Sequence, residues 1–223
     1  MGHYQGCRFL ATQNEDDCRC EEYRYMKVLF IGILILIIEI FGGLVSGSLA
    51  LLADAGHVFV DNGAAIISIL VAIVVRKWRG SEKFARSMGG YVNATLLLVI
   101  AIWVGFEAIT RFYNPREIVS AWMISTAFLG GVLNFWQKME LEQHGEHNHV
   151  THKAMHKHVE SDLLQSVGVV AGGIAIYLTG WQAIDPLISL YIAYKMVVWS
   201  IEIFQMSGKE NGGHSHQHGH HHH

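Results

Sequence analysis

Two short stretches of the sequence each carry a histidine and an aspartate four residues apart. His57 and Asp61 lie in the run LLADAGHVFVDNGA, and His158 and Asp162 lie in HKHVESDLLQSVG. On a helix, residues four apart share one face and lie about one turn from each other. Two such pairs facing each other supply two imidazole nitrogens and two carboxylate oxygens. This set of ligands suits a tetrahedral Zn²⁺ ion.

The charges of this ligand set also suit a divalent cation. Two ionised carboxylates and two neutral imidazoles around such an ion sum to about zero, so burying the complete cluster costs far less than burying a bare ion. Without the metal the two carboxylates face each other, and we expect protons to take the place of the ion. The pattern therefore predicts a site at which metal and protons compete.

The elements that must position these residues are six apolar blocks in a chain that is 51% hydrophobic. Each block is close to twenty residues, the length of helix that crosses about 30 Å of hydrocarbon. Helices satisfy their backbone hydrogen bonds internally, and runs such as FIGILILIIEI lack the alternation of a membrane barrel. We therefore predict an all-α integral membrane protein with transmembrane helices at 27–45, 48–75, 89–112, 118–137, 159–177 and 183–204.

Ionisable residues inside membrane spans are costly, so each is a functional candidate. The second block holds Asp54 besides the first His–Asp pair, and Glu39 lies in the first block. Glu39, like Asn134 in the fourth block, could line an ion path or could form hydrogen bonds between helices. His158 stands at the edge of its block beside Lys157. Its position predicts either a water-filled cavity opening from the cytoplasm or a fifth helix that begins earlier.

Two other features indicate structure rather than chemistry. Asp185 precedes Pro186 where the sixth block begins, as an N-cap residue precedes a proline at the first helical position. Gly168 and Gly172 form a small-xxx-small pair, which predicts close packing of the fifth helix against a neighbour.

The positive charges predict the topology. The connectors after the second and fourth blocks and the segment before the first are rich in Lys and Arg, whereas the first and fifth connectors carry none. By the positive-inside rule both termini face the cytoplasm. The two His–Asp pairs then occupy the second helix of each half of the chain, which suggests an inverted three-plus-three repeat.

The connector after the fourth block is rich in histidine. Imidazoles on a flexible cytoplasmic segment bind Zn²⁺ or Cu²⁺ loosely, so this loop could capture metal, although a solvated linker is an open alternative. We divide the chain into a cytoplasmic segment 1–26, a transport domain 27–205 with the loop 140–157, and a His-rich tail 206–223 whose last residues resemble a purification tag. The histidines of the loop are His144, His147, His149, His152 and His156.

Composition excludes several other classes of protein. The formal net charge of −3 gives no basic surface for nucleic acid. The 3 cysteines are an odd number and make a poor disulfide framework. The first apolar block lacks the cleavage pattern of a signal peptide, so we keep it as a membrane span.

The segments SGSLALLADAGHVFVDNGA and HVESDLLQSVGVVAGGIAIYLTGWQAIDPLISLYIAYKM resemble those of the cation diffusion facilitators. The resemblance covers about 37–196 and implies proton-coupled export of zinc and related divalent ions, with no resident cofactor. It also implies that His57, Asp61, His158 and Asp162 form the transport site. Most members have a cytoplasmic C-terminal domain that holds a dimer. This chain resembles the short members without it, so a homodimer would be held by the helices or the tails.

These features together predict an exporter that moves Zn²⁺, or Cd²⁺, Co²⁺ or Fe²⁺, out of the cytoplasm by alternating access in exchange for protons. Its location would be the cell membrane, or the inner membrane of a bacterium. A passive divalent-cation channel could share the same helices and stays open as an alternative. An intramembrane zinc enzyme would need a vacant water position, which four protein ligands do not leave. A di-haem electron carrier would place acids against the porphyrin.

Overall fold

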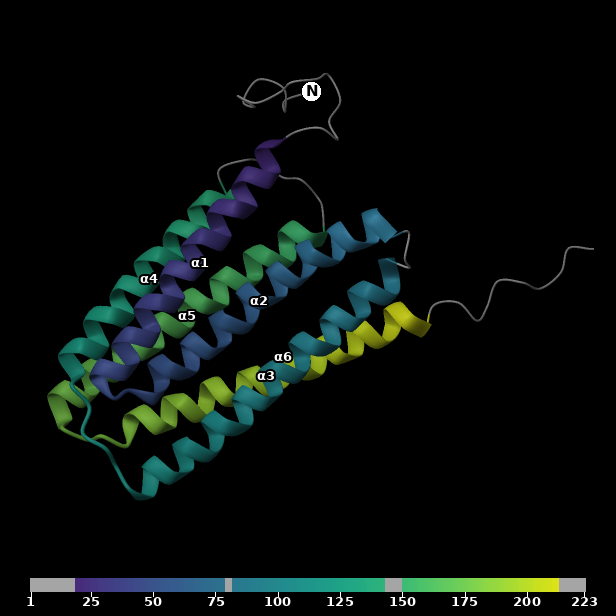
Figure 1. Ribbon diagram of the computed structural model, residues 1–223. Coiled ribbons are helices and arrows are strands. Elements are labelled where there is room, and N and C mark those ends of the chain that lie inside the picture. Colours follow the sequence, from purple (N-terminus) through teal and green to yellow (C-terminus); the bar gives the residue numbers. More distant parts are fainter. Residues whose placement is uncertain (1–18, 79–81, 143–149, 213–223) are drawn as a thin grey trace, which may run out of the picture.

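The computed structural model describes the backbone of residues 19–78, 82–142 and 150–212, and the side chains of 26–63, 66, 87–139 and 162–208. Within these ranges the chain forms six α-helices (Figure 1), and each is longer than its apolar block. The prediction of six helices is confirmed. The helices are α1 (Arg19–Ser46), α2 (Leu49–Trp78), α3 (Glu82–Tyr113), α4 (Ser120–Glu142), α5 (Val150–Thr179) and α6 (Ile184–Gly212).

The early start of α5 explains why His158 lies at the edge of its apolar block. The helix begins at Val150 rather than near residue 159, so the backbone of His158 lies more than two turns inside it. The second of the two explanations is therefore confirmed. A helix that begins early holds Asp162 and His158 on one rigid segment, which fixes their relative position.

Two glycines make the tight turns at the end of the bundle away from the termini. Gly47, between α1 and α2, has φ 75°, and Gly180, after α5, has φ 70°. Glycine adopts this left-handed conformation without steric cost and commonly ends helices. The Gly180 amide also donates to the carbonyl of Ile176 at 2.8 Å, which closes the last turn of α5. These turns keep α1 beside α2 and α5 beside α6.

The helices form a group of four, with a pair packed against it (Figure 1). α3 and α6 pack along most of their length, α1 lies between α2 and α4, and α4 packs on α5. α2 joins the two groups because it also contacts α3 and α6. Each of α1, α2 and α3 contacts the helix three positions later. This arrangement is compatible with the inverted repeat, which stays a prediction. α2 and α5 touch over a short stretch only.

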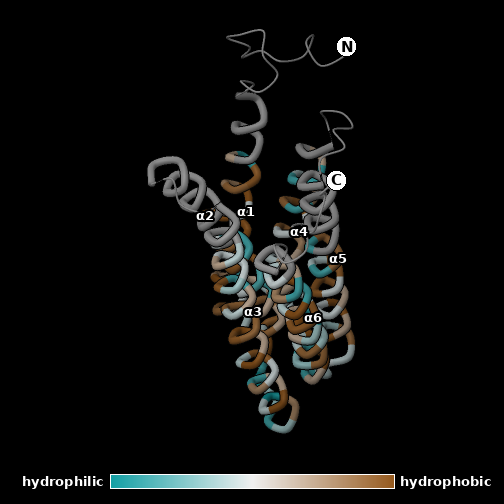
Figure 2. The backbone as a smooth tube through the Cα atoms, turned by 90° about the vertical axis from the view of Figure 1, so that its right-hand side faces the viewer, coloured by the Kyte–Doolittle hydropathy of each residue, from teal (hydrophilic) through white to brown (hydrophobic). Residues whose placement is uncertain are grey.

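The helices are apolar along much of their length, as the brown colour of much of the tube in Figure 2 shows. Large apolar side chains such as Phe30, Phe106 and Leu178 are exposed, as on a surface that faces lipid. Within the described residues, four helices contain a stretch long and apolar enough to cross a bilayer. These stretches are Met26–Ser46, Ser87–Tyr113, Asp162–Thr179 and Ile184–Gly208. The chain is an integral, multi-pass membrane protein.

Polar side chains tie the helices together inside this apolar surface. The Asn134 amide of α4 donates to the Ser166 hydroxyl of α5 at 3.1 Å, and the Gln137 amide donates to the Val28 carbonyl of α1 at 2.8 Å. Away from water, such bonds between helices satisfy groups that would otherwise be costly to bury. Asn134 is therefore an interhelical hydrogen-bond partner, one of its two predicted roles.

Small residues set the distances between helices. A Cβ atom added at Gly172 would overlap the Ile188 side chain of α6, which confirms the predicted close packing at this position. An added Cβ at Gly168 meets no atom within 4 Å, so that half of the prediction is wrong. At Gly42, where α1 packs on α4, an added Cβ would lie 2.5 Å from the Cβ of Thr126.

Gly42 and Gly168 provide a matched pair for testing this packing. We expect Gly42→Ala to destabilise the protein by about 1–3 kcal/mol, because Thr126 is branched at Cβ and α4 must move away. Gly168→Ala should stabilise it by up to about 1 kcal/mol, because alanine favours the helix and finds open space. Thermal unfolding midpoints of the two variants in detergent measure both effects. Equal unfolding midpoints for Gly42→Ala and Gly168→Ala would contradict the close packing of α1 on α4 at Gly42.

Candidate metal centre

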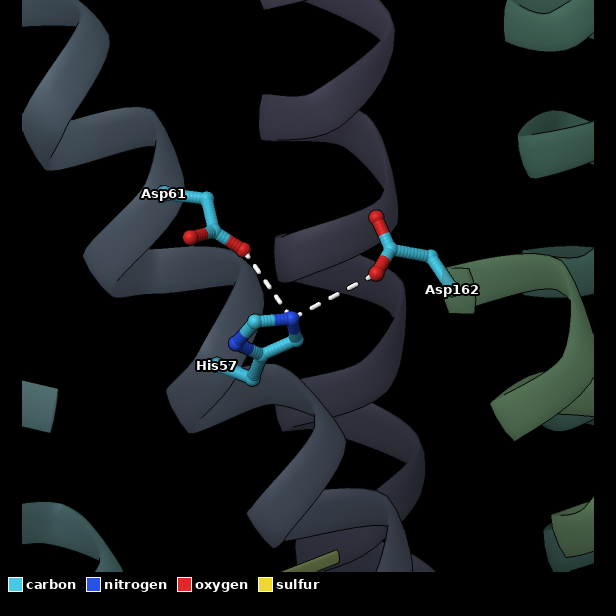
Figure 3. A group of neighbouring side chains, drawn as sticks. All are labelled: His57, Asp61 and Asp162. Atoms are coloured by element: carbon cyan, nitrogen blue, oxygen red, sulfur yellow. Dashed lines mark ion pairs between the residues drawn. The ribbon is translucent and has the colours of Figure 1, made fainter. Parts of the chain in front are cut away.

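Three of the four residues predicted as metal ligands meet between α2 and α5. The Nε2 atom of His57 lies 3.2 Å from Oδ2 of Asp61 and 3.4 Å from Oδ1 of Asp162 (Figure 3). One ligand atom from each of the three residues lies within 4.8 Å of the other two. One imidazole nitrogen and two carboxylate oxygens thus converge from two helices, as the ligands of a divalent cation do.

The local structure explains why these side chains converge. His57 and Asp61 are four residues apart on α2, so they project from one face one turn apart. Asp162 reaches the same point from α5, which contacts α2 over a short stretch only. The gap that this leaves between the helix backbones is bridged by the three side chains, as Figure 3 shows.

The other predicted ligands lie outside the described side chains. His158 belongs to α5, one turn before Asp162, but its side chain lies beyond the described part of the chain. His152 and His156 are also on α5 with their side chains outside the described residues, and His144, His147 and His149 fall in the segment 143–149, which is outside them altogether. Metal binding by these residues stays a prediction.

Burial around the centre changes in one direction along α2. The side chain of His57 is 2% exposed and that of Asp162 is 9% exposed, whereas Asp61 is 25% exposed. Asp61 is the member of this group closest to the C-terminal end of α2. The exposed part of the centre therefore lies toward the C-terminal end of α2. An ion bound between these side chains would be largely removed from water, where its attraction to carboxylates is strong.

An aromatic residue holds the imidazole in place. The indole ring of Trp199 on α6 stacks on the His57 ring, with centroids 4.5 Å apart and planes 24° apart. The ammonium group of Lys195 lies 5.0 Å from the centroid of the indole. Stacking fixes the plane of the imidazole and so the direction of its nitrogens. Sequence reasoning missed Trp199, because a tryptophan in an apolar span gives no signal of such a role.

A second polar layer lies beside the centre. Glu39 of α1 and Asp54 of α2 are hydrogen-bonded through their carboxyl groups, and the Gln165 amide of α5 donates to Oδ1 of Asp54 at 3.3 Å. All three are buried. Glu39 therefore forms a bond between helices, one of its two predicted roles, and does so next to the centre. Gln165 was not predicted, although it follows Asp162 by one turn on a polar face.

The opposite end of the bundle is closed by a buried carboxylate. Oδ2 of Asp185 accepts from the backbone N–H of Leu49 at 2.8 Å, and Oδ1 accepts from Ala50 N–H at 3.2 Å and from the Ser48 hydroxyl at 2.6 Å. Asp185 was predicted to cap its own helix, α6. Its carboxylate instead caps the N-terminus of α2, where the first N–H groups have no partner inside their helix.

Other bonds join the helix ends around Asp185. The Arg111 guanidinium of α3 donates to the Gly47 carbonyl at 2.7 Å and to the Glu107 carboxylate at 2.8 Å. The Val119 N–H before α4 donates to the Ser46 carbonyl of α1 at 2.9 Å. These contacts connect the ends of α1, α2, α3, α4 and α6 on the side away from the termini.

Comparison with known proteins gives the family. A model of the cation efflux transmembrane domain matches residues 26–210. The zinc transporter ZitB of Pectobacterium atrosepticum is 36% identical over 179 residues, which cover 76% of this chain and 55% of the relative. The metal cation efflux system protein CzcD of Cupriavidus metallidurans is 38% identical over 165 residues, covering 70% of this chain and 51% of the relative.

A third relative extends the comparison. The cadmium, cobalt and zinc/H(+)-K(+) antiporter of Bacillus subtilis is 31% identical over 207 residues, 83% of this chain and 65% of the relative. The chain thus spans little more than half the length of the first relatives it matches. The match covers α2 to α5 in full and most of α1 and α6, and it includes every side chain of the centre in Figure 3. The chain therefore belongs to the cation efflux family, whose transmembrane domain it carries, as its resemblance to the cation diffusion facilitators implied.

Proposed function

We propose that this protein exports Zn²⁺ or a similar divalent cation from the cytoplasm in exchange for protons. The observation that carries the proposal is the meeting of His57, Asp61 and Asp162 between α2 and α5. His158, one turn before Asp162 on α5, would supply the fourth ligand. Relatives named as zinc transporters and as a cadmium, cobalt and zinc antiporter support this class of substrate.

The charges of the site support exchange rather than simple passage. With both aspartates ionised and the histidines neutral, a divalent ion is neutralised, so the complete site is tolerable in a medium of low dielectric constant. An empty site would place two negative charges close together, and protons relieve that repulsion. The site would therefore be occupied by metal or by protons in turn.

The accessibility of the site supports alternating access. Exposure at Asp61 and burial at His57 indicate entry from the end that carries the termini, which the positive-inside rule assigns to the cytoplasm. The hydrogen bonds of Asp185 and Arg111 hold the other end together. In this proposal the structure represents the cytoplasm-facing state, and those bonds separate when the ion leaves on the far side. The domain division and the capture of metal by the His-rich loop are part of the same proposal.

The experiment that tests the proposal is zinc-driven proton movement in proteoliposomes. An inward zinc gradient imposed on the wild-type protein is expected to drive protons outward, and a pH dye inside the vesicles reports alkalinisation. With equal zinc concentrations on both sides, a pH gradient that is acid inside should in turn drive zinc accumulation in the vesicles. The exchange should be absent from liposomes without protein.

The same measurement separates the exchanger from a passive channel. A channel would give zinc current at clamped voltage that leaves the internal pH unchanged, and it could not accumulate zinc against a gradient. Zinc flux with no proton movement would contradict the proposed exchange while leaving the metal centre intact.

A further inference from the structure

Beyond the candidate metal centre, a second set of oxygen atoms lies one helical turn away. Glu39, Asp54 and Gln165 come from α1, α2 and α5. Asp54 precedes His57 by three residues, and Gln165 follows Asp162 by three. Because α2 and α5 run in opposite directions, both steps lead toward the same end of the bundle, the one closed by Asp185. The cluster therefore lies between the centre and that end.

The three side chains form one connected group. The carboxyl of Glu39 is hydrogen-bonded to that of Asp54, and the Gln165 amide nitrogen donates to Oδ1 of Asp54 at 3.3 Å. The exposed fractions are 1% for Glu39, 2% for Asp54 and 7% for Gln165. Three helices thus bring two carboxyl groups and one side-chain amide together away from solvent.

One oxygen atom of this group lacks a donor. Among the described residues, Oε1 of Gln165 is buried and has no hydrogen-bond partner. Leaving a buried acceptor without a partner costs about 1–3 kcal/mol, and such atoms in native proteins commonly face an ion or water. A cluster built only to hold helices together would pair its acceptors with donors. This one has an acceptor left over, the carbonyl oxygen of the neutral Gln165 side chain.

We propose that Glu39, Asp54 and Gln165 form a second binding station for a divalent cation, coordinated by oxygen atoms alone. Oxygen ligands suit hard cations such as Mn²⁺ and Mg²⁺ and hold Zn²⁺ less tightly than imidazole does. An ion that leaves the metal centre could therefore bind next at the adjacent, weaker station before it is released. This role in export depends on the proposed function, whereas cation binding by the cluster does not.

Mn²⁺ is the probe that separates this station from the histidine sites, because imidazole-rich segments bind it weakly. The free Mn²⁺ signal in electron paramagnetic resonance counts the ions bound to the full chain in detergent. We expect Glu39→Gln to weaken Mn²⁺ binding at least about tenfold. The same loss should appear when Glu39→Gln is introduced beside Asp61→Asn, in which the metal centre is disabled. Glu202→Gln, on an exposed position of α6, makes the same chemical change and should bind as wild type does.

A second variant avoids changing a charge. Gln165→Leu removes the unpartnered carbonyl oxygen at similar volume and should also weaken Mn²⁺ binding by about tenfold. Binding unchanged by Glu39→Gln and by Gln165→Leu, but lost in Asp61→Asn, would overturn the station and leave the metal centre standing. Normal zinc transport by Asp61→Asn would instead contradict the proposed function, whatever the Mn²⁺ counts show.

Discussion

Replacing Asp162 by alanine is expected to lower zinc transport by at least about 100-fold, more than the 10- to 100-fold cost of losing a hydrogen-bond partner of a metal ligand. Asp162 is the residue that brings α5 into the centre, with Oδ1 at 3.4 Å from the His57 nitrogen. Without its charge, the bound ion keeps one carboxylate, and the site retains a net positive charge away from water. Both the affinity for zinc and the neutrality of the loaded site are lost.

The measurement is zinc uptake into proteoliposomes, followed with a zinc indicator in the lumen. Asp61→Ala should show the same loss, because the two carboxylates cancel the charge of the ion together. Glu202→Gln, which removes a carboxylate from an exposed position on α6, is the control and should transport as wild type does. Near-normal flux in both Asp61→Ala and Asp162→Ala would refute the assignment of the centre.

Asp185→Ala is expected to destabilise the protein by about 3–5 kcal/mol. The substitution removes a carboxylate that accepts three hydrogen bonds, and it leaves the N–H groups of Leu49 and Ala50 without their partner at the start of α2. Each hydrogen bond to a charged acceptor contributes about 1.5–3 kcal/mol, and loss of a helix cap alone costs about 1 kcal/mol. Because the losses share one residue, they do not simply add.

Ser189→Ala provides a matched control for Asp185→Ala. Ser189 is buried one turn further along α6, and its hydroxyl donates at 2.8 Å to the Asp185 carbonyl in the same helix. Its removal should cost less than about 1 kcal/mol, because the carbonyl keeps its place in the helix. Thermal unfolding midpoints in detergent compare the two. If the unfolding midpoint of Asp185→Ala equals that of Ser189→Ala, the Asp185 carboxylate does not hold α6 and α2 together.

The same carboxylate has a consequence for transport. The bonds from Asp185 to α2 and from Arg111 to Gly47 join helix ends that must separate if the ion leaves at this end. They are hydrogen bonds between charged and neutral groups, which can re-form in another arrangement more readily than a packed apolar core can. The end of α2 that they hold is the beginning of the helix that carries His57 and Asp61.

The sequence alone determined the membrane class and predicted the two His–Asp pairs. Blocks of apolar residues near twenty in length can form only helices in lipid, so six of them define the fold class before any contact is known. The His57–Asp61 pair could be recognised because helical periodicity places residues four apart on one face. Asp162 could be recognised because a carboxylate inside an apolar span needs a cation or proton.

Only the tertiary structure decided which distant residues meet. Sequence could not show that Trp199 stacks on His57, that Glu39 bonds to Asp54, or that Asp185 caps α2 rather than α6. Gly168 and Gly172 look alike in sequence, yet only Gly172 faces a neighbouring side chain within reach of a Cβ. The physical reason is that periodicity fixes the face on which a residue lies. Its partner depends on how the helices pack, and the packing depends on contacts between residues far apart in the chain.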